Sequence, residues 1–68
     1  MIINPRYVQY IETDVAQKKV AVVMASGETI WSKPYDNNEA LHGRVDHIEE
    51  CMDNEVMFEF DWSSRGAM

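Results

Sequence analysis

The chain lacks most of the features that support covalent cross-linking or catalysis. It has one cysteine, Cys51, so an intrachain disulfide is excluded, and its Cys and His residues are too few for a structural zinc site. No glycine-rich loop precedes a helix to cradle a phosphate, and no serine has a recognisable base and orienting group. We therefore expect neither an enzyme nor a cofactor.

The sequence also lacks long apolar runs. No stretch approaches the roughly 18 apolar residues that a membrane helix needs, and the N-terminus does not have the basic start and apolar stretch of a secretory signal. A single unpaired cysteine and five methionines fit a reducing compartment. We expect a cytoplasmic protein with no membrane contact.

Basic residues are scarce and are nearly missing from one part of the chain. Nine of the twelve carboxylates lie within residues 36–61, where Arg44 is the only Lys or Arg, so this stretch has a net charge of −9 + 1 = −8. The rest of the chain is slightly basic, which brings the total to −6. Direct binding of nucleic acid needs basic surface and is not expected. One strongly electronegative side is expected instead, and it favours a protein partner with a basic surface.

What the sequence does contain indicates one small folded domain. An apolar content of 46% with seven aromatic residues argues against disorder. We expect the domain to span residues 1–62 and a flexible, polar tail to span residues 63–68. Because so short a chain buries little core and has no disulfide or zinc site, oligomerisation or partner binding is the remaining source of stability.

Three segments rich in β-branched and aromatic residues predict the strands of an antiparallel meander: residues 6–12, 18–24 and 28–33. Gly27 supplies the second turn, and Pro34 ends the third strand because it has no backbone N–H to donate. Tyr7, Tyr10, Trp31 and the alternate residues of 20–24 cannot all lie beneath one helix. Some apolar surface should therefore remain uncovered, which favours a homodimer or a partner.

The hydrophobic period then changes to that of a helix over residues 38–52. Its apolar stripe consists of Leu41, Val45, Ile48 and Met52. Residues 36–38 are all good N-cap types, and residues 53–54 make a plausible stop. Residues 55–62 alternate as a final strand, with Val56, Phe58, Phe60 and Trp62 on one face. The predicted fold is α+β, in the order β-β-β-α-β, with one amphipathic helix on one face of a meander sheet.

Residues 25–35 followed by residues 38–48 resemble the YegP-like family of small bacterial domains. The matching positions are Gly27, Ser32, Tyr35, Gly43, Val45 and Ile48. The resemblance spans about residues 7–52, and it leaves out the final strand. Pro34 and an acidic helix depart from the family pattern. The resemblance implies the same strand order and a tendency to form a dimer, and it implies no mechanism.

Two pairs of side chains on the predicted helix have the spacing of a metal site or of a catalytic pair. His42 and Asp46, four residues apart, could hold a divalent metal, but a site of two ligands without a third from another element is poor, so solvated residues are the favoured interpretation. Cys51 and His47 have the spacing of a nucleophile and its base, but a free cysteine beside Ile48 more often belongs to the core.

The acidic residues support the most concrete hypothesis. Those of the last strand should face outward at intervals of about 6.6 Å, beside an acidic helix edge, and so imitate a row of phosphates. We expect a non-enzymatic inhibitor, of the type that phages or mobile elements direct against CRISPR or restriction complexes. Its acidic surface would occupy a basic site. The predicted partner-binding residues are Asp46, Glu49, Glu50, Asp53, Glu55, Glu59 and Asp61. The alternative is a YegP-like homodimer whose acidity serves solubility.

Overall fold

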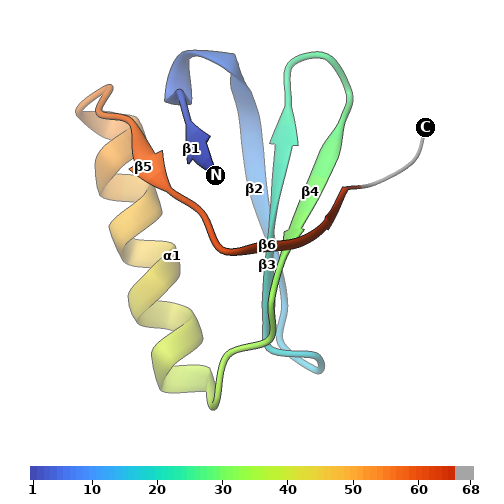
Figure 1. Cartoon of the computed structure of the whole chain (residues 1–68). Helices are drawn as coiled ribbons and strands as arrows, with labels where there is room; N and C mark the ends of the chain where they lie inside the picture. Colours follow the sequence, from blue (N-terminus) through green and yellow to red (C-terminus); the bar gives the residue numbers. More distant parts are fainter. Residues whose placement is uncertain (66–68) are drawn as a thin grey trace.

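A four-stranded antiparallel sheet forms the larger layer of the fold (Figure 1). The computed structural model describes residues 1–65. β2 (Val8–Asp14), β3 (Lys19–Met24) and β4 (Thr29–Ser32) form a meander, and β6 (Trp62–Arg65) pairs with the outer side of β4, which gives the order β2-β3-β4-β6. β2 therefore lies at one edge of this sheet.

A second, two-stranded sheet joins the beginning of the chain to its last third. β1 (Ile2–Ile3) pairs antiparallel with β5 (Phe58–Glu59), and a short 3-10 turn, η1 (Pro5–Tyr7), connects β1 to β2. Asn4 caps this turn by accepting the Arg6 N–H at 3.0 Å. The pairing of β1 with β5 is a contact across more than fifty residues, and it fixes where β5 lies.

The helix α1 (Asn38–Asp53) begins and ends with local hydrogen bonds. The Asn37 side chain accepts the Ala40 N–H at 2.8 Å, which satisfies one of the free donors of the first turn. At the other end the Val56 N–H donates to the Cys51 carbonyl at 2.8 Å, and Glu55 adopts a positive φ of 57°. This is a Schellman motif with glutamate where glycine is usual.

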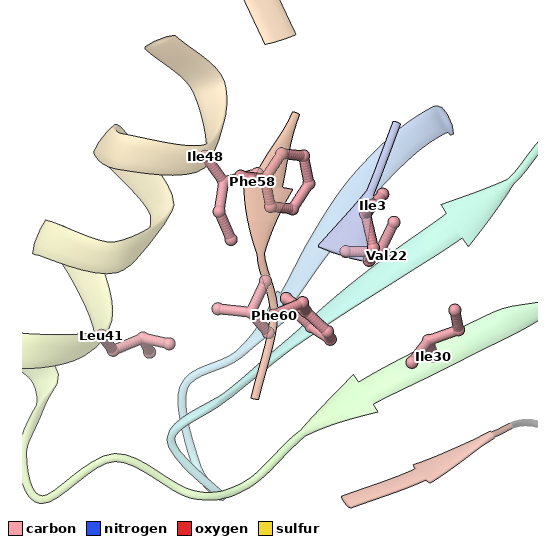
Figure 2. Close-up of a cluster of buried hydrophobic side chains, with 8 residues drawn as sticks. Ile3, Val22, Ile30, Leu41, Ile48, Phe58 and Phe60 are labelled. Atoms are coloured by element: carbon pink, nitrogen blue, oxygen red, sulfur yellow. The ribbon is translucent and has the colours of Figure 1, made fainter. Parts of the chain in front are cut away.

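The core lies between the four-stranded sheet on one side and α1 with the β1–β5 pair on the other (Figure 2). Its fully buried members include Leu41 and Ile48 from α1 and Phe60, which follows β5. The Phe58 and Phe60 rings meet edge to face with centroids 6.5 Å apart. Tyr35 packs against this cluster, and its buried hydroxyl has no hydrogen-bond partner within the described residues.

The α+β prediction is confirmed, with the meander and the helix where they were expected. The helix extends one residue further than predicted, and Asn37 is the N-cap. The expectation of uncovered apolar side chains is confirmed for Tyr7 and Tyr10, whereas Trp31 is half-buried and residues 20–23 are buried.

Two strand predictions need correction. The first strand begins at Val8 instead of residue 6, because the Asn4–Pro5 pair starts the η1 turn. The single final strand over residues 55–62 is wrong. β5 and β6 are separate strands in different sheets, because the chain leaves β1 after Glu59 and crosses to β4. Phe58 and Phe60 point into the core as predicted, but Val56 and Trp62 are exposed.

The predicted tail also starts too early. Ser63 lies within β6, and the strand continues to Arg65, so these residues belong to the sheet. The rest of the predicted tail, residues 66–68, lies outside the described part of the chain. Within residues 1–65, no helix has the length and apolar character needed to cross a membrane.

Candidate partner-binding surface

Four of the seven predicted binding residues lie together on one side of α1. At about 100° per residue, they occupy roughly 100° of the helix circumference. We call this set the acidic flank of α1: Asp46, Glu49, Glu50 and Asp53. All four side chains are exposed. The helical period therefore brings them together, as the sequence predicted.

The other three residues, Glu55, Glu59 and Asp61, form a second group that we call the acidic β5 segment. Glu55 lies in the turn after α1, Glu59 lies in β5, and Asp61 lies between β5 and β6. All three are exposed, and Glu59 is 70% exposed. They do not form the evenly spaced row that was expected, because the predicted strand is interrupted after β5.

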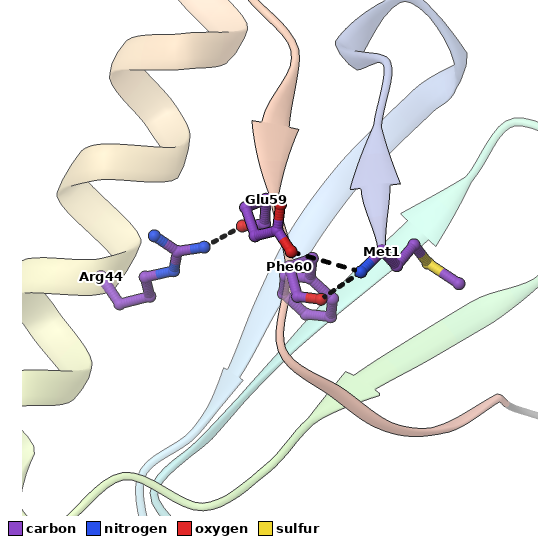
Figure 3. A network of polar contacts seen from close by, with 4 residues as sticks. All are labelled: Met1, Arg44, Glu59 and Phe60. Carbon is purple, nitrogen blue, oxygen red and sulfur yellow. Dashed lines mark hydrogen bonds and ion pairs between the residues drawn. The ribbon is translucent and has the colours of Figure 1, made fainter.

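Arg44 separates the two acidic groups. It lies about 170° around α1 from the middle of the acidic flank, and its guanidinium donates to the backbone carbonyl of Glu59 (Figure 3). The chain's terminal amine also approaches this point. It lies 3.7 Å from the Glu59 carboxylate and donates to the Phe60 carbonyl at 3.3 Å. The acidic flank and the acidic β5 segment therefore lie on different sides of the helix and do not form one continuous wall.

Basic side chains do not neutralise either group. Among these seven carboxylates, the ion pair found within the described residues is that of Glu59 with the terminal amine, at 3.7 Å. Arg44, the nearest basic residue in sequence to the acidic flank, is bonded to a carbonyl and not to a carboxylate. The acidic flank of α1 therefore presents four negative charges to solvent.

A groove runs beside the acidic flank, between α1 and the edge strand β2. It has a volume of about 450 Å³. Its lining residues are Gln9, Tyr10 and Ile11 from β2 and Glu49, Met52 and Asp53 from α1. No pattern in the sequence predicts this groove, because it requires two segments about forty residues apart to lie side by side.

Neither the His42/Asp46 pair nor the His47/Cys51 pair forms a complete site within the described residues. His42 and Asp46 are both exposed, and residues 1–65 contain no group of three or more His, Cys, Asp or Glu side chains positioned to hold a metal ion. The Cys51 sulfur lies 3.7 Å from His47 Nε2, and Cys51 is half-buried against the core. His47 is exposed and has no orienting partner among the described residues, so the pair lacks the third group of a nucleophilic site.

Comparison of the chain with protein-family models, with curated proteins and with solved structures finds no match. An argument about function therefore rests on the fold and on the charged surface.

Proposed function

We propose that this protein is a non-enzymatic binding domain that attaches to a basic surface of a protein partner. The acidic flank of α1 supplies the main contact, and the acidic β5 segment, on another side of the helix, adds to the negative field that draws the partner in. The supporting observation is that all seven carboxylates are exposed and that no Lys or Arg side chain within the described residues forms an ion pair with them. Such a field attracts a basic partner over long range.

The position of the acidic flank supports a role in binding, because it opposes helix stability. Glu50 and Asp53 lie in the C-terminal part of α1, where the helix dipole favours cations, and the last turn has no basic residue. The pairs Asp46–Glu50 and Glu49–Asp53 place like charges four residues apart. Each such pair costs a few tenths of a kcal/mol. Solubility alone would be served equally well by carboxylates in the first turn.

Glu55 gives a second argument of the same kind. It occupies the left-handed position of the Schellman motif, with φ 57°, where a residue with a side chain is about 1 kcal/mol less stable than glycine. The exposed carboxylate is present at a position that the backbone would assign to glycine. A function for the charge accounts for both this residue and the acidic flank.

The most concrete form of the proposal is an inhibitor of a host defence complex, such as a CRISPR or restriction complex, of the type encoded by phages and mobile elements. Such complexes hold nucleic acid in basic grooves, and the exposed carboxylates would compete with the nucleic acid for those grooves. The inhibitor would act in the cytoplasm, where these complexes work. It would not contact nucleic acid itself.

The experiment is capture of partners from cells by the full chain, with charge variants as the controls. Asp46→Asn with Glu50→Gln, and separately Glu59→Gln with Asp61→Asn, should each weaken retention of a nucleic-acid-binding protein. Asp36→Asn with Glu39→Gln removes the same charge elsewhere and should retain it. Retention should fall steeply between about 50 and about 300 mM salt. Retention that is unaffected by salt and by both pairs would refute the proposal.

A YegP-like homodimer is the second candidate, and one observation favours it. Tyr7 and Tyr10 are 60% and 45% exposed, and exposed aromatic side chains are typical anchors of a protein interface. In this case the partner is a second copy and the acidity serves solubility. Light scattering distinguishes the candidates, because a tight dimer that buries these tyrosines supports the second.

A further inference from the structure

The edge strand β2 has backbone groups available for pairing. Within residues 1–65, it is the terminal strand of the sheet and pairs with β3 alone. Outside that ladder, the backbone hydrogen bond given for Val8–Asp14 within the described residues is the one from the Val8 N–H to the Pro5 carbonyl, at the start of the strand. The outward N–H and C=O groups of β2 therefore form a template onto which another extended chain could pair.

The groove beside this edge is suited to a particular side-chain pattern. Ile11 and Met52 both pack against the core and give it an apolar floor, while Glu49 and Asp53 place carboxylates on its helical side. Tyr10 shares the opposite face of the sheet with its partner Val23, and Glu12 shares that face with Ala21. A strand along β2 would thus meet negative charge on both of its faces.

We propose that β2 and this groove bind an extended, basic segment of the protein partner, which adds to the sheet as a fifth strand beside β2. The inference rests on the proposed function and names the chemistry of the partner. Backbone hydrogen bonds to β2 supply affinity, and alternate side chains supply specificity. An apolar side chain of the segment lies over Ile11 and Met52. Its Lys and Arg side chains reach Glu49, Asp53 and Glu12.

Charge argues against a second copy of this chain as the occupant of the edge. Val8–Asp14 contains Glu12 and Asp14 and no Lys or Arg. Pairing two β2 strands would bring these carboxylates near one another and near the groove carboxylates of both copies, and like charges on neighbouring strands are destabilising. A basic strand reverses the sign of each of these contacts.

The test titrates the isotope-labelled full chain with a short peptide of alternating lysine and valine and follows amide signals by NMR. The amides of Gln9, Tyr10 and Ile11 should shift, and outward β2 amides should exchange more slowly. Glu49→Gln with Asp53→Asn should weaken binding about tenfold, whereas Asp36→Asn with Glu39→Gln should leave it unchanged. Dispersed spectra of both variants confirm that they are folded.

Two control peptides separate strand addition from simple charge attraction. A peptide N-methylated at alternate residues keeps its charge but loses donors to β2, and it should bind at least tenfold more weakly. An alternating glutamate and valine peptide should not bind. Equal binding of the methylated peptide, or shifts on the acidic flank without shifts in β2, would overturn strand addition while leaving the proposed function standing.

Two further outcomes also count against the inference. Complete absence of peptide binding would overturn it, and the Asp46/Glu50 capture experiment would then decide the proposed function separately. Shifts of the β2 amides that grow with protein concentration, without peptide, would assign the edge to a second copy and overturn the basic segment.

Discussion

The acidic flank of α1 and the acidic β5 segment carry similar charge but are positioned by different forces. The acidic flank lies on one regular helix, which Asn37 caps and which Leu41 and Ile48 hold against the sheet. The acidic β5 segment is mostly irregular. A two-residue strand, the buried Phe58 and Phe60, and contacts from Arg44 and the terminal amine keep it in place.

The difference shows that equal charge density in a sequence does not give equal arrangement in space. On α1 a local period decides which carboxylates are neighbours. Around β5 the neighbours depend on pairing with β1, at the other end of the chain. Because both regions rest on one core, a change in that core should affect both, whereas a change to a cap, a turn or a surface charge should act mainly on one. The following variants compare these effects.

The largest effect is expected for Phe60→Ala, which removes the fully buried ring that holds the acidic β5 segment. The free energy of unfolding should fall by about 3–5 kcal/mol, because the change leaves a cavity in the core. A domain of this size has little more than that in total, so most molecules should be unfolded. Urea denaturation measures the loss. Phe60→Leu, which refills much of the volume, should lose clearly less, and equal losses would show that the cavity is not the cause.

A smaller effect is expected for Asn37→Ala, which acts on α1. The variant loses the 2.8 Å hydrogen bond to the Ala40 N–H, so the free energy of unfolding should fall by about 1 kcal/mol. Asn38→Ala is the matched control, since Asn38 is exposed within the first turn and caps nothing. If the control loses as much as Asn37→Ala, the cap bond contributes nothing measurable.

Glu55→Gly should change stability in the opposite direction. Glycine adopts the positive φ of this position without steric cost, so the free energy of unfolding should rise by about 1 kcal/mol. Glu55→Gln removes the charge but keeps the side chain, and it should gain little. Thermal unfolding followed by circular dichroism measures both, and a gain as large in the glutamine variant would assign the effect to charge.

The smallest effect is expected for Glu50→Lys on the acidic flank. Stability should rise by about 0.5 kcal/mol, because the lysine pairs with Asp46 and favours the helix dipole. The gain should shrink as salt is added. Binding to the proposed partner should weaken at the same time. A stability gain without any loss of partner binding would remove Glu50 from the proposed surface.

The local parts of the fold were predictable because neighbours in sequence decide them. The apolar stripe of α1 and its capping residues gave the helix to within one residue, and the runs around Gly27 gave the meander. The Asn4–Pro5 start of η1 is also a local signal, and the strand assignment overlooked it.

The parts that could not be predicted depend on distant contacts. The alternation of apolar and polar residues correctly predicted that Phe58 and Phe60 point inward. It could not show that β5 pairs with Ile2–Ile3 while β6 pairs with β4. For the same reason the sequence identified all seven carboxylates as exposed but placed them on one wall. The groove between α1 and β2 depends on tertiary packing and has no sequence signature.

The hydroxyl of Tyr35 makes this residue a built-in sensor of local opening. The hydroxyl oxygen is buried and has no hydrogen-bond partner among the described residues, and Tyr35 lies just before α1 begins. Such a hydroxyl loses its hydration on folding and gains no hydrogen bond in exchange. Tyr35→Phe should therefore not lower the free energy of unfolding. The hydroxyl should meet solvent when the connection between β4 and α1 moves away from the core, and a fluorinated tyrosine at this position would report that opening.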